Sequence, residues 1–291
     1  MNISELASAY ITEKELRRRV STVNGYKSSI RLYVLPEFGE FTIEQITPEH
    51  IQSWIDRFSL PGAAKKAYKC LRQIIRWAIR KYRLRVYDPT IGIELPRIPA
   101  YRPETLDAKQ LRTFLRGMWN NEFEPSALLS ATLGLRLGEC MGLSWDCIDF
   151  RSGAVNVKCT RQYISGAFYT YPTKTEKSER VCYLPKFALK RLRDIWRLLG
   201  KPKGLITPEK PQTVARRIKA WCKSHDLPHV SMTNLRHTWA TLATEAGVAI
   251  ETVAMMLGHS NIMTAYNHYI RPRRSICVDA QKAVEQLLLS A

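Results

Sequence analysis

A proline-rich segment, LPRIPAYRP at residues 95–103, divides the chain into two unequal parts. Proline fixes φ and removes a backbone donor, so the three prolines of this segment disfavour both helix and sheet. A single core of 291 residues would also lie near the upper size limit of one domain. We therefore predict a first domain at 1–97, a linker at 98–104 and a second domain at 105–291.

The first part of the chain has helical patterns and no convincing strand. Thr47 followed by Pro48 marks a helix start, because threonine accepts at the N-cap and proline suits the first helical position. The first domain is therefore expected to be all-helical. Its expected helices lie at 3–11, 23–35, 48–58 and 63–82.

The fourth of these helices has a row of basic side chains at steps of three or four residues. Between Lys65 and Arg85 there are nine basic residues and no acidic one. Such a like-charged row costs about a few tenths of a kcal/mol per pair in an isolated helix, so a neutralising partner is expected. The net charge of +19 also calls for a polyanion. We predict a DNA-binding row, with a solvated helix face as the alternative: Lys65, Lys69, Arg72, Arg76, Arg80 and Arg83.

The second part of the chain mixes helical patterns with a short run of β-like segments. The predicted fold class is therefore mainly α with a small antiparallel sheet. The expected strands lie at 154–158, 167–171 and 180–184. The expected helices lie at 106–119, 126–135, 186–198, 214–225, 234–246, 250–257 and 278–289.

Several classes of protein are disfavoured by composition. The seven cysteines form no CxxC pair and their number is odd, so they are expected to be small buried residues. No apolar run approaches the roughly 18 residues that span a bilayer, and the N-terminus does not resemble a signal peptide. No GxxxxGK[ST] string for nucleotide binding is present. We predict a cytoplasmic protein with no metal, no cofactor and no membrane partner.

Three short strings in the second part contain the residues best suited to chemistry. They are ATLGLRLGECMGLSW at 131–145, MTNLRHTWAT at 232–241 and MLGHSNIMTAYNHY at 256–269. Together with PTKTEKSER at 172–180, and behind a basic helical domain, they resemble the tyrosine recombinase (phage integrase) family over essentially the whole chain. The resemblance implies a helical core-binding domain followed by a mixed α+β catalytic domain. It also implies a site-specific recombinase that cleaves and rejoins duplex DNA through a 3′-phosphotyrosyl intermediate, integrating or excising a phage or other mobile element.

Two arginines and one glutamate are matched by the resemblance. Arg136 and Arg236 stand at the positions of the family's catalytic arginines. Guanidinium groups supply a permanent charge and a two-pronged donor that suits the non-bridging oxygens of a pentavalent phosphate. Glu139 stands at the family's acidic position, and a spacing of three places it on one helical face with Arg136. Glu139 is expected to orient Arg136.

Three further positions complete the site that the resemblance implies. Lys174 matches the lysine that protonates the departing 5′ oxygen, with Lys177 as its competitor. His259 matches the residue that donates a hydrogen bond to the phosphate. Tyr269, ten residues after His259, matches the nucleophile, and Tyr266 is the alternative. Because a phenol has a pKa near 10, the surrounding positive charge must activate it.

One position departs from the family pattern. Thr233 stands three residues before Arg236, where the family commonly has His and less often Lys. Threonine can donate a hydrogen bond but cannot act as a base near neutral pH. Proton removal from the tyrosine then falls to water or another group, or the enzyme is slow, or catalysis has been lost.

The resemblance also implies partners. These are duplex DNA recombination sites, other copies of the chain in a tetramer on paired sites, and an accessory directionality or DNA-bending protein. The helix at 278–289 is expected to dock on a neighbouring copy, with packing on its own core as the alternative. Little sequence precedes the first helix, so a separate arm-binding domain is not expected. Two alternative functions are an Xer-like dimer-resolving recombinase and a catalytically impaired sequence-specific DNA-binding protein.

Overall fold

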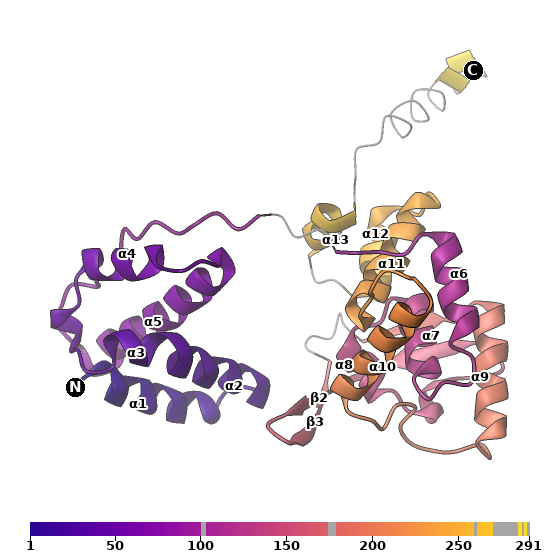
Figure 1. Cartoon of the computed structure of the whole chain (residues 1–291), viewed down its shortest axis with the longest axis horizontal. Helices are drawn as coiled ribbons and strands as arrows, with labels where there is room; N and C mark the ends of the chain where they lie inside the picture. Colours follow the sequence, from indigo (N-terminus) through magenta and orange to yellow (C-terminus); the bar gives the residue numbers. More distant parts are fainter. Residues whose placement is uncertain (100–102, 174–178, 259–260, 270–284, 287, 290–291) are drawn as a thin grey trace. The chain divides into compact units, whose positions relative to one another are not determined.

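The computed structural model describes residues 1–99, 103–173, 179–258, 261–269, 285–286 and 288–289 (Figure 1). The chain forms two compact units, residues 1–101 and residues 102–291. Each unit has its own hydrophobic core. No helix among these described residues is long and apolar enough to cross a membrane.

The first unit contains helices alone among its described residues (Figure 1). The predicted helix at 23–35 is part of a longer helical run, because a π-helical turn joins α2 to α3. The helices are α1 (Ile3–Glu15), α2 (Val20–Ser29), the π-turn (Ile30–Val34), α3 (Leu35–Phe38), a 3₁₀ turn (Ile43–Gln45), α4 (Pro48–Asp56) and α5 (Pro61–Tyr82).

Local sequence sets the ends of these helices. Asn2 caps α1 by accepting from the backbone N–H of Glu5, whose carboxylate accepts from the N–H of Asn2 in return. Thr47 caps α4 as predicted, accepting from the His50 N–H at 3.2 Å. Helix α5 ends where Arg83 adopts a left-handed conformation, with φ of 51°.

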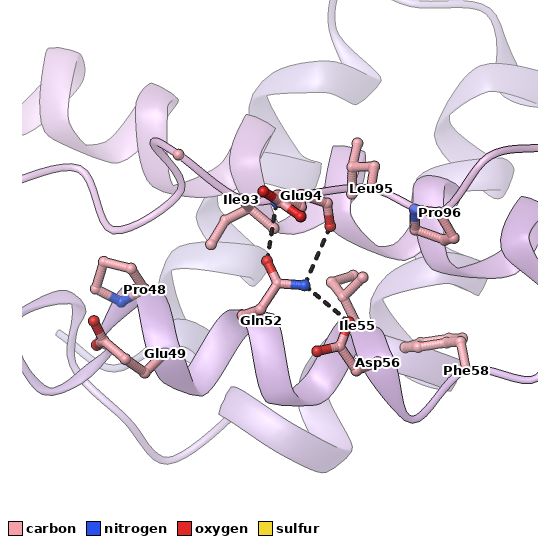
Figure 2. Close-up of a pocket in the computed structure, with 11 residues that line it drawn as sticks. Pro48, Glu49, Gln52, Ile55, Asp56, Phe58, Ile93, Glu94, Leu95 and Pro96 are labelled. Carbon is pink, nitrogen blue, oxygen red and sulfur yellow. Dashed lines mark hydrogen bonds between the residues drawn. The ribbon is translucent and has the colours of Figure 1, made fainter.

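A polar clamp fixes the chain after α5 against α4, at the edge of a pocket lined by both segments (Figure 2). The Gln52 Oε1 accepts from the Glu94 N–H at 2.9 Å, and its Nε2 donates to the Glu94 carbonyl at 3.3 Å. The same Nε2 donates to the Asp56 carboxylate at 2.8 Å. Because Gln52 pairs with both backbone groups of Glu94, it holds this stretch as a neighbouring strand would.

The second unit surrounds a central buried helix. The helices are α6 (Ala108–Gly117), α7 (Glu124–Leu133), α8 (Leu137–Gly142), α9 (Lys186–Leu198), α10 (Pro211–Ser224), α11 (Met232–Glu245), α12 (Ile250–Leu257) and α13 (Ile262–Tyr269). Every residue of α7 is buried, and α7 packs along α11. Its polar groups have partners, since the Ser130 hydroxyl donates to the Met232 carbonyl at 2.9 Å.

Two antiparallel strand pairs lie in this unit: β1 (Ala154–Val157) with β4 (Arg180–Tyr183), and β2 (Cys159–Ile164) with β3 (Ala167–Pro172). Strand β2 was not predicted, because CTRQYI shows no clean alternation of apolar and polar residues. The predicted class, mainly α with a small antiparallel sheet, is confirmed. Most of the predicted helix at 278–289 lies outside the described residues.

Candidate active site

Arg136 begins the site at a sharp turn between two helices. Helix α7 ends at Gly134, whose φ of 62° suits glycine, and a Cβ there would lie 2.7 Å from Leu257. Arg136 is the N-cap of α8, and its backbone N–H donates to Glu139 Oε2 at 2.9 Å. Its guanidinium donates to Glu139 Oε1 at 2.8 Å. The predicted orienting contact between Glu139 and Arg136 is therefore present.

Arg236 lies on α11, and only 5% of its surface is exposed. Ser231 caps this helix by accepting from the Asn234 N–H. The Arg236 guanidinium donates to the Gly134 carbonyl at 2.8 Å and to the Leu257 carbonyl at 3.0 Å. Both predicted arginines thus meet at the junction of α7, α11 and α12.

A third arginine, Arg180, belongs to the same cluster and was missed in the sequence. It is the first residue of β4, and 9% of its side chain is exposed. It donates to Glu139 Oε1 at 3.2 Å and to Oε2 at 2.9 Å, and its Nε donates to the Met256 carbonyl at 2.7 Å. The available signal was its place at the end of the PTKTEKSER string.

The three arginines share the carboxyl end of α12. The Met256 carbonyl accepts from Arg180, the Leu257 carbonyl from Arg236 and the Gly258 carbonyl from Arg136, the last at 2.8 Å. Three consecutive carbonyls that a helix end leaves without intrahelical partners are therefore each paired with a different guanidinium. The negative end of the helix dipole adds a further attraction for these cations. We call Arg136, Arg180, Arg236 and Glu139 the arginine cluster.

Glu139 is ionised within this cluster. Burial opposes its charge, but hydrogen bonds and charge from Arg180, together with those of Arg136, hold the pKa of the Glu139 carboxyl below its usual value of 4.5. Three guanidinium charges and one carboxylate leave the cluster with a net charge of +2. The Arg136 side chain remains 41% exposed, so the cluster can present positive charge and N–H donors to an anion.

The remaining predicted residues lie on α11, on α13 or outside the described residues. Thr233 is exposed in the first turn of α11, one turn before Arg236. Tyr269 is the last residue of α13, on which Tyr266 is 49% exposed. Helix α13 packs on α11 and α12, and its Ala265 is fully buried. Lys174 and His259 lie outside the described residues, as does Lys177.

Five members of the predicted DNA-binding row lie on α5, and the sixth, Arg83, is the residue at which the helix ends. Lys65 and Arg72 are half-buried. The other four members of the row are exposed: Lys69, Arg76, Arg80 and Arg83. Arg76 lies 3.5 Å from Asp88, and the Arg72 guanidinium lies over the Tyr68 ring at 5.9 Å. The opposite side of α5 forms the core of the first unit. The row is thus a basic surface on a firmly packed helix.

Comparison with known families decides the relationship of this chain. Residues 105–275 match the model described as the phage integrase family. The chain belongs to this family. Residues 2–59 also match the phage integrase N-terminal SAM-like domain. As a phage integrase family member, the chain is a tyrosine site-specific recombinase.

Individual relatives agree with this assignment. Tyrosine recombinase XerC of Mannheimia succiniciproducens is 27% identical over 248 residues, which cover 77% of each chain. The integrase of transposon Tn1549, solved with transposon right end DNA, shares the fold with a TM-score of 0.81 at 18% identity, over all of both chains. Lambda integrase, solved as a tetramer bound to a Holliday junction, has a TM-score of 0.70 at 19% identity, over 94% of this chain and 79% of its own.

Proposed function

We propose that this integrase family member cleaves and rejoins duplex DNA at specific sites, and so integrates or excises a phage or other mobile element. The observation that supports this most is the arginine cluster, which combines a net charge of +2 with a partly exposed Arg136. Stabilising charge that develops on a reacting phosphate is the largest single contribution such a site can make. The energy of the phosphodiester is kept in the covalent protein–DNA link, so the reaction needs no ATP.

In the proposed reaction, the Tyr269 phenol attacks the phosphorus and forms a 3′-phosphotyrosyl link. Arg136 and Arg236 donate to the non-bridging oxygens, which gain negative charge as the phosphorus becomes pentavalent. His259 donates a further hydrogen bond, and Lys174 protonates the departing 5′ oxygen. The free 5′-hydroxyl of a partner duplex then attacks the phosphotyrosine and reverses the step. Since Thr233 cannot take the phenol proton near neutral pH, water takes that role in this proposal.

We further propose that the α5 row binds the DNA backbone. Its side chains are arginines and lysines on one face, and such groups contact phosphates without reading bases. The proposed assembly is a tetramer on paired sites in the cytoplasm, acting on nucleoid DNA, with the segment at 278–289 docking on a neighbouring copy. An accessory directionality or DNA-bending protein completes the proposed partners.

A second candidate function has the same chemistry but a different biological role. Several XerC recombinases match 77–89% of the chain at 25–27% identity, which favours dimer resolution as the alternative. Sequencing the flanks of the gene separates the two, because a mobile element would have its ends there. A binding protein without catalysis, for which Thr233 is the supporting feature, is a third outcome of the experiment that follows.

The test uses a duplex that spans the end of the DNA element encoding the chain, with a nick close to the cleavage point. The nick lets the short 5′-hydroxyl fragment diffuse away, so the covalent adduct accumulates. We expect adduct with the wild type and with Tyr266→Phe, and none with Tyr269→Phe. Duplex binding without any wild-type adduct would leave the binding-protein alternative. Adduct lost with Tyr266→Phe and kept with Tyr269→Phe would move the nucleophile to Tyr266.

A further inference from the structure

Arg180 has no part in the reaction proposed above, yet it lies at the centre of the arginine cluster. Nine percent of its side chain is exposed, against 41% for Arg136. Its guanidinium is instead engaged with protein groups, since it donates to both oxygens of Glu139 and to the Met256 carbonyl. Its role in the reaction would therefore have to act through its neighbours.

The first neighbour is Glu139, which Arg180 shares with Arg136. Oε1 of Glu139 accepts from the Arg136 guanidinium at 2.8 Å and from Arg180 at 3.2 Å. Oε2 accepts from the Arg136 backbone N–H at 2.9 Å and from Arg180 at 2.9 Å. Each carboxylate oxygen thus accepts one bond from each arginine. The two-pronged contact of Arg180 fixes the plane of the carboxylate to which Arg136 binds.

The second neighbour is the carboxyl end of α12. Arg180 Nε donates to the Met256 carbonyl, and Arg136 donates to the Gly258 carbonyl two residues later. The Arg136 guanidinium therefore has two partners, Glu139 and Gly258, and Arg180 holds the segments that provide both. Arg136 itself is the most exposed arginine of the cluster, and it donates to the phosphate in the proposed reaction.

We infer that Arg180 is a positioning residue, which sets the orientation of the Arg136 guanidinium for phosphoryl transfer. This inference rests on the proposed function. If Arg180 only stabilised the fold, replacing it would lower stability but would not change the reaction rate per folded molecule. Loss of an orienting contact, by contrast, lowers the rate by about tenfold to a hundredfold without a matching loss of substrate binding.

The second unit contains a matched control for the stabilising role. Arg191 of α9 pairs with Glu124, the first residue of α7, and donates to its Oε2 at 2.8 Å. The side chains are 17% and 2% exposed, so this is also a nearly buried arginine with a buried carboxylate. Neither Arg191 nor Glu124 has a contact with the arginine cluster among the contacts that the structure describes for them.

The experiment compares Arg180→Gln with Arg191→Gln in the full chain. Thermal unfolding and binding to the intact duplex are measured first, and single-turnover adduct formation on the nicked duplex follows at saturating protein. We expect both variants to unfold at lower temperature. We expect Arg180→Gln to form adduct about tenfold to a hundredfold more slowly, with Arg191→Gln within about twofold of the wild type. Arg180→Lys, which keeps the charge but not the fork, should unfold closer to the wild type and remain slow.

A double-mutant cycle tests whether the effect passes through Arg136. When Arg136→Lys has already removed the oriented guanidinium, Arg180→Gln should add less than about a threefold loss of rate. Equal rates for folded Arg180→Gln and Arg191→Gln, or fully multiplied losses in the cycle, would overturn the inference alone. A wild type that binds the duplex and forms no adduct would overturn the proposed function together with the inference.

Discussion

Replacing Gly258 with alanine tests how far the arginine cluster depends on the turn that ends α12. Gly258 has a φ of 65°, and a Cβ built there lies 2.9 Å from an Arg180 terminal nitrogen and 3.5 Å from one of Arg136. Ordinary contact begins at 3.4 Å, so the Arg180 tip must move by about 0.5 Å. Because Arg180 positions Arg136 in the inference above, this movement misplaces the Arg136 guanidinium, and a misplacement of 1 Å at a catalytic group costs about a hundredfold. We therefore expect Gly258→Ala to form adduct about tenfold more slowly.

Gly247 provides the matched control for backbone strain. Its φ is 85°, and no atom lies within 4 Å of a Cβ built there. Alanine in the left-handed region costs about 1–2 kcal/mol at either glycine, which lowers the melting temperature of a unit this size by about 2–8 °C. Calorimetry should thus show similar losses for Gly247→Ala and Gly258→Ala, while adduct assays separate them. An adduct rate for Gly258→Ala within twofold of that for Gly247→Ala would refute the reasoning.

Three further predictions concern Thr233, Glu139 and the basic row of α5. Thr233→His places a base on an exposed helix turn without disturbing the core. Adduct formation should therefore accelerate about tenfold or more, and it should slow below about pH 6.5, where the imidazole is protonated. An unchanged rate would mean that proton removal does not limit the step. Because the pKa of Glu139 is lowered from 4.5, its ionisation stabilises the fold above that pH and this stability is lost as pH falls toward the lowered pKa. Urea midpoints of the wild type and Glu139→Gln should therefore converge in acid, and a constant difference at all pH values would contradict this. Replacing both Arg76 and Arg80 with Gln should reduce the slope of log affinity against log salt by about 1.8. The control is Lys81→Gln, because the Lys81 ammonium pairs with Glu13 away from the row, and this variant should leave the slope unchanged. Equal slopes for the double variant and the control would contradict the DNA-binding role of the row.

The sequence predicted those elements whose signals are local. The Thr47 and Pro48 start of α4 was visible in two adjacent residues, and α5 showed in its own spacing of basic and apolar side chains. Helix α8 was not predicted, because its six residues, 137–142, are too few to show a helical period. Helix α13, with eight residues, was also not predicted.

The resemblance named Arg136, Arg236 and Glu139, which the fold brings together, but it did not name Arg180. Arg136 and Glu139 are three residues apart, so a contact was expected from their spacing, although Arg136 is the N-cap of α8 and not a residue within it. Arg180 lies 41 residues after Glu139, and its bond to Met256 spans 76 residues. A charged residue at the start of a strand is expected at the surface unless a partner is known. Its burial therefore could not be inferred from its local sequence.

The clamp at Gln52 has a counterpart in the second unit, and the two clamps bound the stretch of sequence that joins the units. The Asn234 side-chain amide donates to the Glu104 carbonyl at 2.8 Å, as Gln52 does to Glu94. The two clamped positions, Glu94 and Glu104, are ten positions apart in the sequence, which limits the distance between them to roughly 33–36 Å. For a ligand that one unit has bound, a connection of this length gives the other unit an effective concentration of about millimolar. Once one unit has bound a ligand, binding by the other unit is an intramolecular step, so two weak binding surfaces can together give tight binding.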